Sequence, residues 1–261
     1  MRIRANGIEI HYELTGLESA PVVTLSHSLL ANFAMWNPQM PALADYRVLR
    51  FDTRGHGQSE ATPGAYDFEL LADDTCALLD AVGIQRTHFV GLSMGGMIGQ
   101  AVALKYPERI ESLILCDTRG HSPPERSKSR AERIAVAQRH GVEPMVEAAL
   151  EGWFSDGFRQ SNPEVMEAVR TMIRSTSVAG LVGCTHAIDT QIHTPRLHEV
   201  VAPTLVIVGE EDRSTPVSES RDLHERIAGS ELVVLPEARH FSNMERVSEF
   251  NQALRSFLSN V

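Results

Sequence analysis

The chain is poor in cysteine, and the three that it has, Cys76, Cys116 and Cys184, form no CxxC pair. Three scattered thiols cannot build a disulfide framework, so we expect reduced cysteines and a cytoplasmic protein. Positively charged residues are also fewer than negatively charged ones. The sequence has 24 Lys and Arg against 34 Asp and Glu, a formal net charge of −10. A protein this acidic does not favour a phosphate backbone, so we expect no nucleic-acid partner.

Long hydrophobic runs, internal repeats and low-complexity tracts are absent as well. Nothing approaches the run of about 18 apolar residues that a membrane helix needs, so we expect no membrane partner. The first residues, MRIRANGIEIHYEL, alternate like a strand and lack the apolar core and cleavage site of a signal peptide. The composition, 43% hydrophobic and 22% charged, is typical of a globular protein. The oligomeric state is left open.

What the chain does contain is a series of short β-branched runs, each ended by Gly, Asp, His or Pro. They occupy 8–14, 21–27, 46–52, 87–93, 111–117, 203–209 and 231–237. Helix-length segments with an apolar stripe lie at 68–82, 94–106, 218–228 and 244–258. This alternation predicts an α/β fold with a mostly parallel sheet flanked by helices. We expect the first run to pair antiparallel at the sheet edge, with the second run as a further candidate.

One region interrupts the alternation. Between 119 and 197 no strand is evident, and segments such as AERIAVAQRHG and NPEVMEAVRTMIRS have the pattern of short amphipathic helices. We therefore predict a core domain formed by 1–118 and 198–261, with a helical cap inserted at 119–197.

The most informative stretch is THFVGLSMGGMIGQ, in which a strand pattern meets Gly-x-Ser-x-Gly and then a helix pattern. A strand–turn–helix would present Ser93 at the carboxyl edge of the sheet, where open α/β folds bind ligands. Side chains at Gly91 and Gly95 would clash in so tight a turn. The helix that starts at Met94 would direct its amides at a developing oxyanion. The alternative is a glycine-rich turn that contains a serine by chance. Other residues of the sequence are needed to distinguish the two interpretations.

An acid and a base follow Ser93 in the chain order that a nucleophile elbow requires. Asp212 comes just after the strand run at 203–209, and His240 follows the last strand run. We predict a catalytic triad of Ser93, Asp212 and His240. Three other acids compete with Asp212: Asp117, which is our second choice because it also ends a strand, and Glu210 and Glu211.

The loop LSHSLLANFAMW follows the second strand run, where this kind of fold supplies an oxyanion-hole amide. We predict that the hole is formed by the backbone N–H groups of Leu29 and Met94. The segment DTRGHGQS at 52–59 is interpreted as a structural turn, and not as a second catalytic site.

Taken together, FDTRGHGQS, VGLSMGGM, VGEEDRSTPV and ARHFSNMERV resemble the α/β-hydrolases over nearly the whole chain. Within them the sequence most resembles the 3-oxoadipate enol-lactonases and small carboxylesterases. The resemblance implies an α/β-hydrolase fold with a cap, the same triad and oxyanion amides, and no cofactor. Two positions depart from the enol-lactonase pattern: Leu30 replaces an expected glycine, and Arg130 replaces an expected tryptophan.

Three cap residues are candidates for substrate binding. Arg133, in an arginine-rich stretch at 119–139, could bind a substrate carboxylate, while Trp153 and His186 could line the pocket. His186, Asp189 and His193 are spaced as on one helix face, but histidines that line a pocket are the better interpretation, and we predict no metal.

The sequence thus predicts a serine hydrolase of small carboxylic esters or lactones that works through an acyl-enzyme. An acyl-homoserine-type lactonase and a carbon–carbon-bond hydrolase are the enzyme alternatives. A ligand receptor on a hydrolase scaffold is the non-enzyme alternative.

Overall fold

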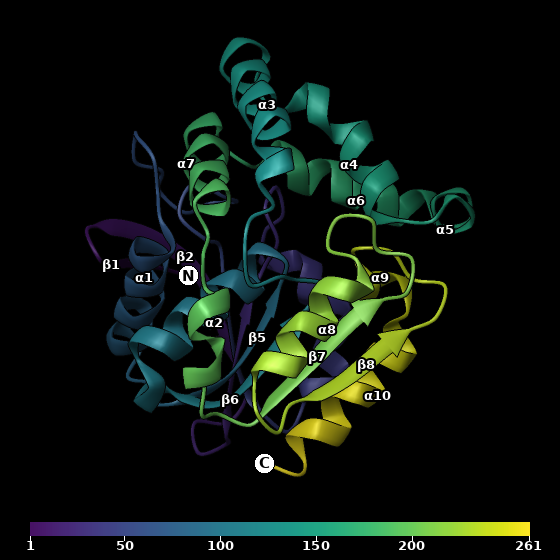
Figure 1. Ribbon diagram of the computed structural model, residues 1–261. Helices are drawn as coiled ribbons and strands as arrows, with labels where there is room; N and C mark the ends of the chain where they lie inside the picture. The colour runs from purple at the N-terminus through teal and green to yellow at the C-terminus, as the bar shows by residue number, and fades with distance from the viewer.

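A single eight-stranded sheet forms the centre of the computed structural model, which describes residues 1–261 (Figure 1). Its strands are β1 (Arg2–Ala5), β2 (Ile8–Thr15), β3 (Val22–Ser26), β4 (Arg47–Phe51), β5 (Thr87–Leu92), β6 (Ile110–Cys116), β7 (Thr204–Gly209) and β8 (Glu231–Leu235). The spatial order is β1-β2-β4-β3-β5-β6-β7-β8. All pairs from β4 to β8 are parallel. The predicted α/β fold with a mostly parallel sheet is confirmed.

The antiparallel part of the sheet differs in detail from the expectation. The first predicted run, β2, does pair antiparallel, with β4 on one side and β1 on the other. The second run, β3, is parallel to both of its neighbours, so its proposed antiparallel pairing was wrong. The edge strand β1 was not separated from the alternating pattern of the first residues, because its four residues, RIRA, carry no hydrophobic run of their own.

Helices cover both faces of the sheet. One layer contains α1 (Phe68–Ala81), α2 (Met94–Lys105), α8 (Val217–Arg226) and the 3₁₀ helix η5 (Thr194–Glu199). The other contains η1 (Phe33–Leu43), α9 (Ser242–Glu245) and α10 (Val247–Leu258). Short 3₁₀ turns η2 (Pro107–Arg109), η3 (Pro124–Arg126) and η4 (Glu143–Met145) complete the connections. Coverage on both faces explains why β5 and β7 are buried along their whole length.

The region between β6 and β7 is helical, as predicted. It contains α3 (Ser127–His140), α4 (Val146–Trp153), α5 (Asp156–Ser161), α6 (Pro163–Arg174) and α7 (Val178–Asp189). These helices gather at the top of Figure 1, at the end of the sheet toward which the parallel strands point. The helical region therefore stands over the edge where β5 delivers Ser93.

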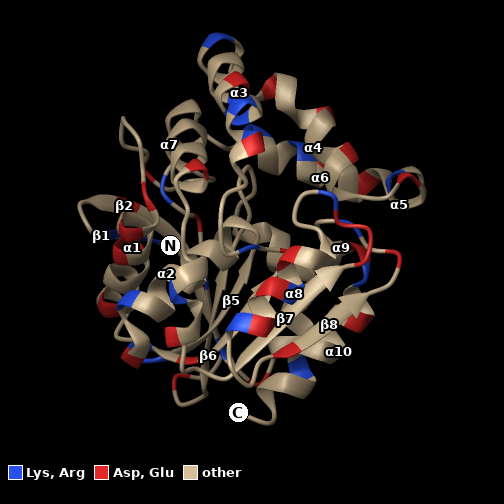
Figure 2. Ribbon diagram, in the orientation of Figure 1, with Lys and Arg blue, Asp and Glu red and all other residues tan.

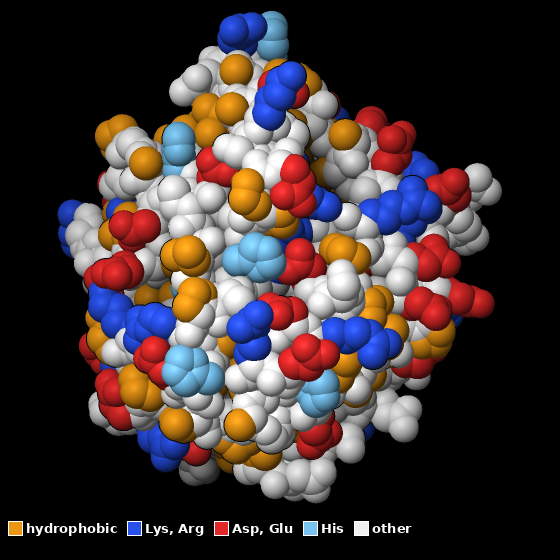
Figure 3. Space-filling view, viewed as in Figure 1, with side chains coloured by type: hydrophobic (Ala, Val, Ile, Leu, Met, Phe, Trp, Pro, Cys, Tyr) orange, Lys and Arg blue, Asp and Glu red, His pale blue; other side chains and the backbone are white.

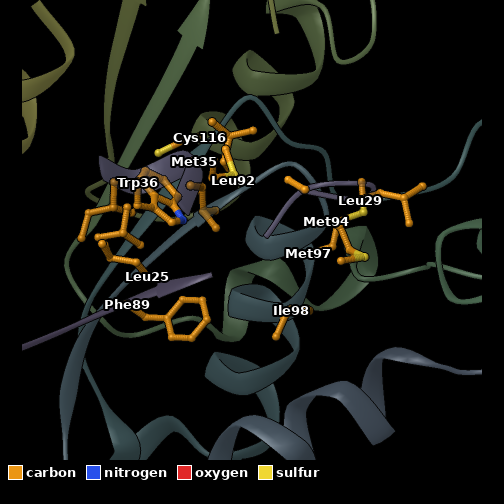
Figure 4. Packing of buried hydrophobic residues seen from close by; sticks show 14 of the residues in the cluster. Leu25, Leu29, Met35, Trp36, Phe89, Leu92, Met94, Met97, Ile98 and Cys116 are labelled. Carbon is orange, nitrogen blue, oxygen red and sulfur yellow. The ribbon is translucent and has the colours of Figure 1, made fainter. Parts of the chain in front are cut away.

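The main hydrophobic core joins the sheet, the α2 layer and the inserted helices in one cluster. Figure 4 shows Trp36, Met35 and Leu92 packed together, with Met94, Met97 and Leu29 in a neighbouring group. The loop after β3 and the first turn of α2 therefore share a packed interior, which holds their backbones in register.

The segment DTRGHGQS forms a buried turn, stabilised by an ion pair. The Arg54 guanidinium donates to both carboxylate oxygens of Asp74 on α1, at 2.7 and 2.5 Å, and each side chain is about 5% exposed. Removing one partner of a buried ion pair leaves the other charge buried without a partner.

Arg54→Met is therefore expected to lower the free energy of unfolding by about 3–5 kcal/mol in urea denaturation. Arg86→Met is the control, because Arg86 and Glu111 form a pair that is largely exposed. Losing an exposed pair is expected to cost about 1 kcal/mol or less. Equal losses for the two variants would contradict a structural role for the Arg54–Asp74 pair.

The outer surface is mixed in character. On the face in Figure 3, hydrophobic side chains appear in small groups among charged side chains of both signs. No helix combines the length and the apolarity that crossing a bilayer requires.

Candidate active site

Ser93 lies at the junction of β5 and α2. Its backbone has a conformation that residues other than glycine rarely adopt. Its φ is 55° and its ψ is −114°. The surroundings enforce this strain: the Ser93 amide donates to the Cys116 carbonyl at 2.8 Å, and the Thr118 hydroxyl donates to the Ser93 carbonyl at 2.7 Å. Strain that neighbouring bonds maintain is typical of functional positions.

The two flanking glycines are required by space, as the sequence suggested. A Cβ atom at Gly91 would lie 2.2 Å from the Gly95 carbonyl oxygen, and one at Gly95 would lie 2.1 Å from the Ser26 carbonyl oxygen. Strand and helix thus approach to backbone contact around Ser93, which leaves its side chain at the tip of the turn.

Asp212 and His240 form a buried hydrogen-bonded pair. The distance from Nδ1 of His240 to Oδ2 of Asp212 is 2.8 Å, and both residues are 3% exposed. The Asp212 carboxylate also accepts bonds from the Ser214 amide at 2.7 Å and from the Thr215 hydroxyl at 2.6 Å. Burial acts against ionisation of Asp212, but the His240 charge and these hydrogen bonds outweigh it, so its pKa lies below the usual value.

The rival acids are placed elsewhere. Glu210 and Glu211 are exposed on the loop before Asp212. Asp117 is fully buried, but its carboxyl group accepts hydrogen bonds from the Gly209 amide and the Ser242 hydroxyl and not from His240. Of the four acids, only Asp212 contacts the imidazole.

Ser93 and His240 line one cavity of about 530 Å³ beneath the helical region. No direct hydrogen bond joins the Ser93 hydroxyl to the His240 ring in this structure. The His240 ring is hydrogen-bonded to Asp212 and Thr215 instead. Contacts between a nucleophile and its base are often long before substrate binds and shorten when it does. The cavity that both residues line has space for a small ligand.

The loop after β3 contributes Ser28, Leu29 and Leu30 to the same cavity. The Leu29 amide makes no hydrogen bond within the protein, and the Met94 amide is the first of helix α2, so it has no partner from a preceding turn. Leu30 has a φ of 63°, which explains why a glycine is expected there. Two free amides are thus available close to Ser93.

Four arginines line this cavity: Arg119, Arg126, Arg130 and Arg133. Figure 2 shows Lys and Arg on α3 and its approach, within a protein that is acidic overall. Arg130 is neutralised by Asp189 at 2.6 Å. Arg126 donates only to the backbone carbonyls of Ser214 and Arg213, so its charge has no carboxylate partner.

Arg133 makes no hydrogen bond or ion pair. The residue is exposed on α3 and lines the cavity. Desolvation there, together with repulsion from Arg130 and Arg126, lowers the pKa of Arg133. An unpaired cation in this position can bind an anionic group of a ligand.

Trp153 connects the helical region to the His240 loop. Its ring lines the cavity and stacks on Phe241, with ring centroids 4.2 Å apart and planes 9° from parallel. The Phe241 amide donates to the Trp153 carbonyl at 3.1 Å. Glu245 adds a second link, accepting from the Ser155 amide at 2.9 Å and the Arg239 amide at 2.8 Å. The end of α4 and the residues around His240 are therefore one packed unit.

The structure does not bring His186 to the cavity, where Ile188 is the residue that α7 contributes. The suggested histidine face also fails, because α7 ends at Asp189 and His193 lies beyond it, packed against Phe68. Asp189 is bound to Arg130, and no group of three His, Cys, Asp or Glu side chains is placed to hold a metal ion.

Sequence reasoning missed Thr215, whose amide and hydroxyl both bind Asp212. The signal was present in EEDRSTP, since an Asp followed by Ser and Thr often accepts bonds from the next turn. A wider groove of about 880 Å³ beside α10 is lined by polar residues such as Tyr46 and Arg255 and contains neither Ser93 nor His240.

Comparison with known proteins agrees with this geometry. The profile of the alpha/beta hydrolase fold family matches residues 21–247. The chain belongs to the α/β-hydrolase family.

Among individual relatives, 3-oxoadipate enol-lactonase 2 of Acinetobacter baylyi is 33% identical, over 98% of this chain and 95% of its own. The crystal structure of the enol-lactonase from Burkholderia xenovorans LB400 superposes with a TM-score of 0.95 at 36% identity, covering 99% of this chain and all of that one. A thermophilic esterase from Thermogutta terrifontis, solved with malate bound, has a TM-score of 0.94 at 32% identity and covers 100% of this chain and 98% of its own. The chain is thus a hydrolase related to enol-lactonases and esterases.

Proposed function

We propose that this protein is a serine hydrolase that cleaves small carboxylic esters or lactones through an acyl-enzyme. One observation carries the proposal: the hydrogen-bonded pair of Asp212 and His240 borders the same cavity as Ser93, which stands on a strained strand–helix turn. The enol-lactonase and esterase relatives support the substrate class. In this proposal 1–118 and 198–261 are the catalytic core, and 119–197 is the cap.

The reaction would proceed in two halves. Nε2 of His240 takes the Ser93 hydroxyl proton as the oxygen bonds to the substrate carbonyl carbon, while the Leu29 and Met94 amides donate to the oxyanion. The leaving oxygen departs with the proton from His240. Water, deprotonated by His240, then attacks the acyl carbon, and His240 returns that proton to the Ser93 oxygen as the acid is released. Asp212 holds the Nδ1 proton and stabilises the charged imidazole throughout. All these groups are protein groups, so the reaction needs no cofactor.

Turnover of p-nitrophenyl acetate, together with covalent labelling by an organophosphonate, tests the proposal. We expect hydrolysis and a single adduct, mapped to Ser93 by peptide mass spectrometry. A protein that binds small ligands without turnover and without an adduct would instead be a receptor on a hydrolase scaffold.

Three cap residues were candidates for binding substrate, and the proposal retains Arg133 and Trp153. The unpaired guanidinium of Arg133 is suited to a substrate carboxylate, and the Trp153 ring provides an apolar wall. His186 is not retained because it does not reach the cavity. A kcat/KM panel of enol-lactone, aliphatic lactones and short aryl esters separates a lactonase that prefers carboxylate-bearing substrates from a general esterase.

Arg133→Met is expected to raise KM about tenfold for a carboxylate-bearing lactone and to leave KM for p-nitrophenyl acetate unchanged. A hydrogen bond to a charged group contributes about 1.5–3 kcal/mol, and the open cavity mouth places the effect at the lower end. Arg139→Met is the matched control, since Arg139 is exposed on the same helix and does not line the cavity. Equal changes for both lactone and acetate would count against carboxylate binding by Arg133.

A further inference from the structure

Asp117 is a buried carboxyl group for which the proposed reaction has no chemical step. It follows β6 directly, it is 0% exposed, and its φ of 44° is strained for a residue with a side chain. Its amide donates to the Ile207 carbonyl on β7 at 2.8 Å, which holds its backbone against the neighbouring strand. A buried polar group in a strained conformation calls for a functional reason.

The two oxygens of Asp117 bind the two loops that carry the acid and the base. Oδ1 accepts from the Gly209 amide at 2.9 Å, at the start of the loop that leads to Asp212. Oδ2 accepts from the Ser242 hydroxyl at 2.5 Å, two residues after His240. One carboxyl group thus contacts both the loop that carries Asp212 and the loop that carries His240.

The same two loops touch backbone to backbone beside Asp117. A Cβ atom at Gly209 would lie 2.3 Å from the Arg239 carbonyl oxygen and 2.5 Å from that of Ala238. A change in the position of Gly209 would therefore displace the residue before His240, and the reverse also holds. Backbone bonds from the Glu211 amide to the Ala238 carbonyl and from the Glu210 amide to the Leu235 carbonyl, both at 2.8 Å, also join the two loops, and the Asp117 carboxyl group adds one bond to each.

The negative charge of Asp212 is compatible with a carboxyl group at Asp117. Burial and the nearby charge of Asp212 raise the pKa of Asp117, which favours its neutral form. Asp117 and Asp212 therefore need not carry two negative charges at close range. The bridge acts through its two hydrogen bonds, to the Gly209 amide and the Ser242 hydroxyl, and not through its charge.

We propose that Asp117 is a positioning residue, whose carboxyl group sets the alignment of Asp212 with His240 by joining Gly209 to Ser242. The inference rests on the proposed triad chemistry. Removing the bridge would let the two loops separate slightly, and a misplacement of about 1 Å in a catalytic group can lower a rate by about 10²-fold. Substrate binding would be spared, because Asp117 does not line the cavity.

The test compares Asp117→Ala, Ser242→Ala and Asp117→Asn. Asparagine retains both contacts, since its oxygen can accept from the Gly209 amide and its NH₂ group can donate to the Ser242 hydroxyl. We expect kcat to fall about tenfold or more in Asp117→Ala and Ser242→Ala, with KM within about twofold of the original, and to recover largely in Asp117→Asn. Thr24→Val is the control, because it removes a buried hydroxyl pair between Thr24 and Thr87 on the same sheet without touching either loop. It should lower the melting temperature and leave kcat unchanged.

A second measurement does not depend on turnover. The low-field proton resonance of His240 Nδ1–H reports its bond to Asp212, and it should shift or broaden in both alanine variants but not in Asp117→Asn. Alanine variants that lose thermal stability yet keep kcat and this resonance would overturn the proposal. An Asp117→Asn variant as impaired as Asp117→Ala would also overturn it, since charge and not bridging would then be responsible. If the unmodified protein cleaves no ester at all, the proposed function fails, while the resonance still tests the bridge.

Discussion

Replacing Ser93 by alanine is expected to lower kcat for ester hydrolysis by at least about 10⁴-fold, the largest single effect we predict. The hydroxyl stands on the strained strand–helix turn and lines the same cavity as His240. Without it no acyl-enzyme can form, and only binding and the oxyanion amides remain. Labelling by an organophosphonate should disappear together with turnover.

The fold should survive this change, because the structure contains no hydrogen bond from the Ser93 hydroxyl to another protein group that its loss would leave unpaired. Ser93→Gly provides a matched second variant. Glycine tolerates a φ of 55°, so Ser93→Gly should be equally inactive but more stable than Ser93→Ala by about 1 kcal/mol. Chemical denaturation of both variants measures this difference. Substantial activity in either variant would rule out Ser93 as the nucleophile.

Asp212→Asn is expected to lower kcat by about 10⁴-fold with little change in KM. Oδ1 accepts from the Ser214 and Thr215 amides, so the asparagine oxygen must remain there. Its NH₂ group then faces Nδ1 of His240, which must become an acceptor and move the imidazole proton to Nε2. In that tautomer the nitrogen directed to the nucleophile is already protonated and cannot act as a base.

Glu211→Gln is the control for Asp212→Asn, because Glu211 is the exposed neighbour of Asp212 in the chain. It should leave kcat and its pH dependence unchanged. Similar losses in the two variants would indicate that the net charge of the loop, and not the Asp212–His240 bond, supports the rate.

Much of the fold was predictable because its strands are buried on both faces and its turns carry strong local signals. The run THFVGL is buried at every position, and Gly91 and Gly95 reveal the tight turn after it. The helix predicted at 244–258 proved to be two, α9 and α10, divided at Arg246, where φ is −123° and ψ is 59°. No glycine or proline marks that break, which lies next to Glu245, whose carboxylate accepts from the Ser155 amide of the inserted helical region.

Some residues of the site could be predicted from the sequence, and others could not. Asp212 and His240 were identified from chain order, and the structure joins them. The error at His186 has a simple cause, since a sequence gives the period of a helix but not the direction in which it is turned toward its neighbours. The bridging contacts of Asp117 could not be predicted either, because they join the ends of β6 and β7 to the start of α9, which meet only in the folded protein. The boundaries drawn at 119 and 197 stay predictions.

The joint between Trp153 and Phe241 limits how such an enzyme can be remodelled. A chimaera that received inserted helices without a matching tryptophan would lose the ring stacked on Phe241, and would shift the imidazole next to it. Grafting a lid to change the preferred ester would therefore alter turnover as well. Diversification of this scaffold must proceed by paired changes on both sides of that ring stack, and not by exchange of the upper helices as a separable module.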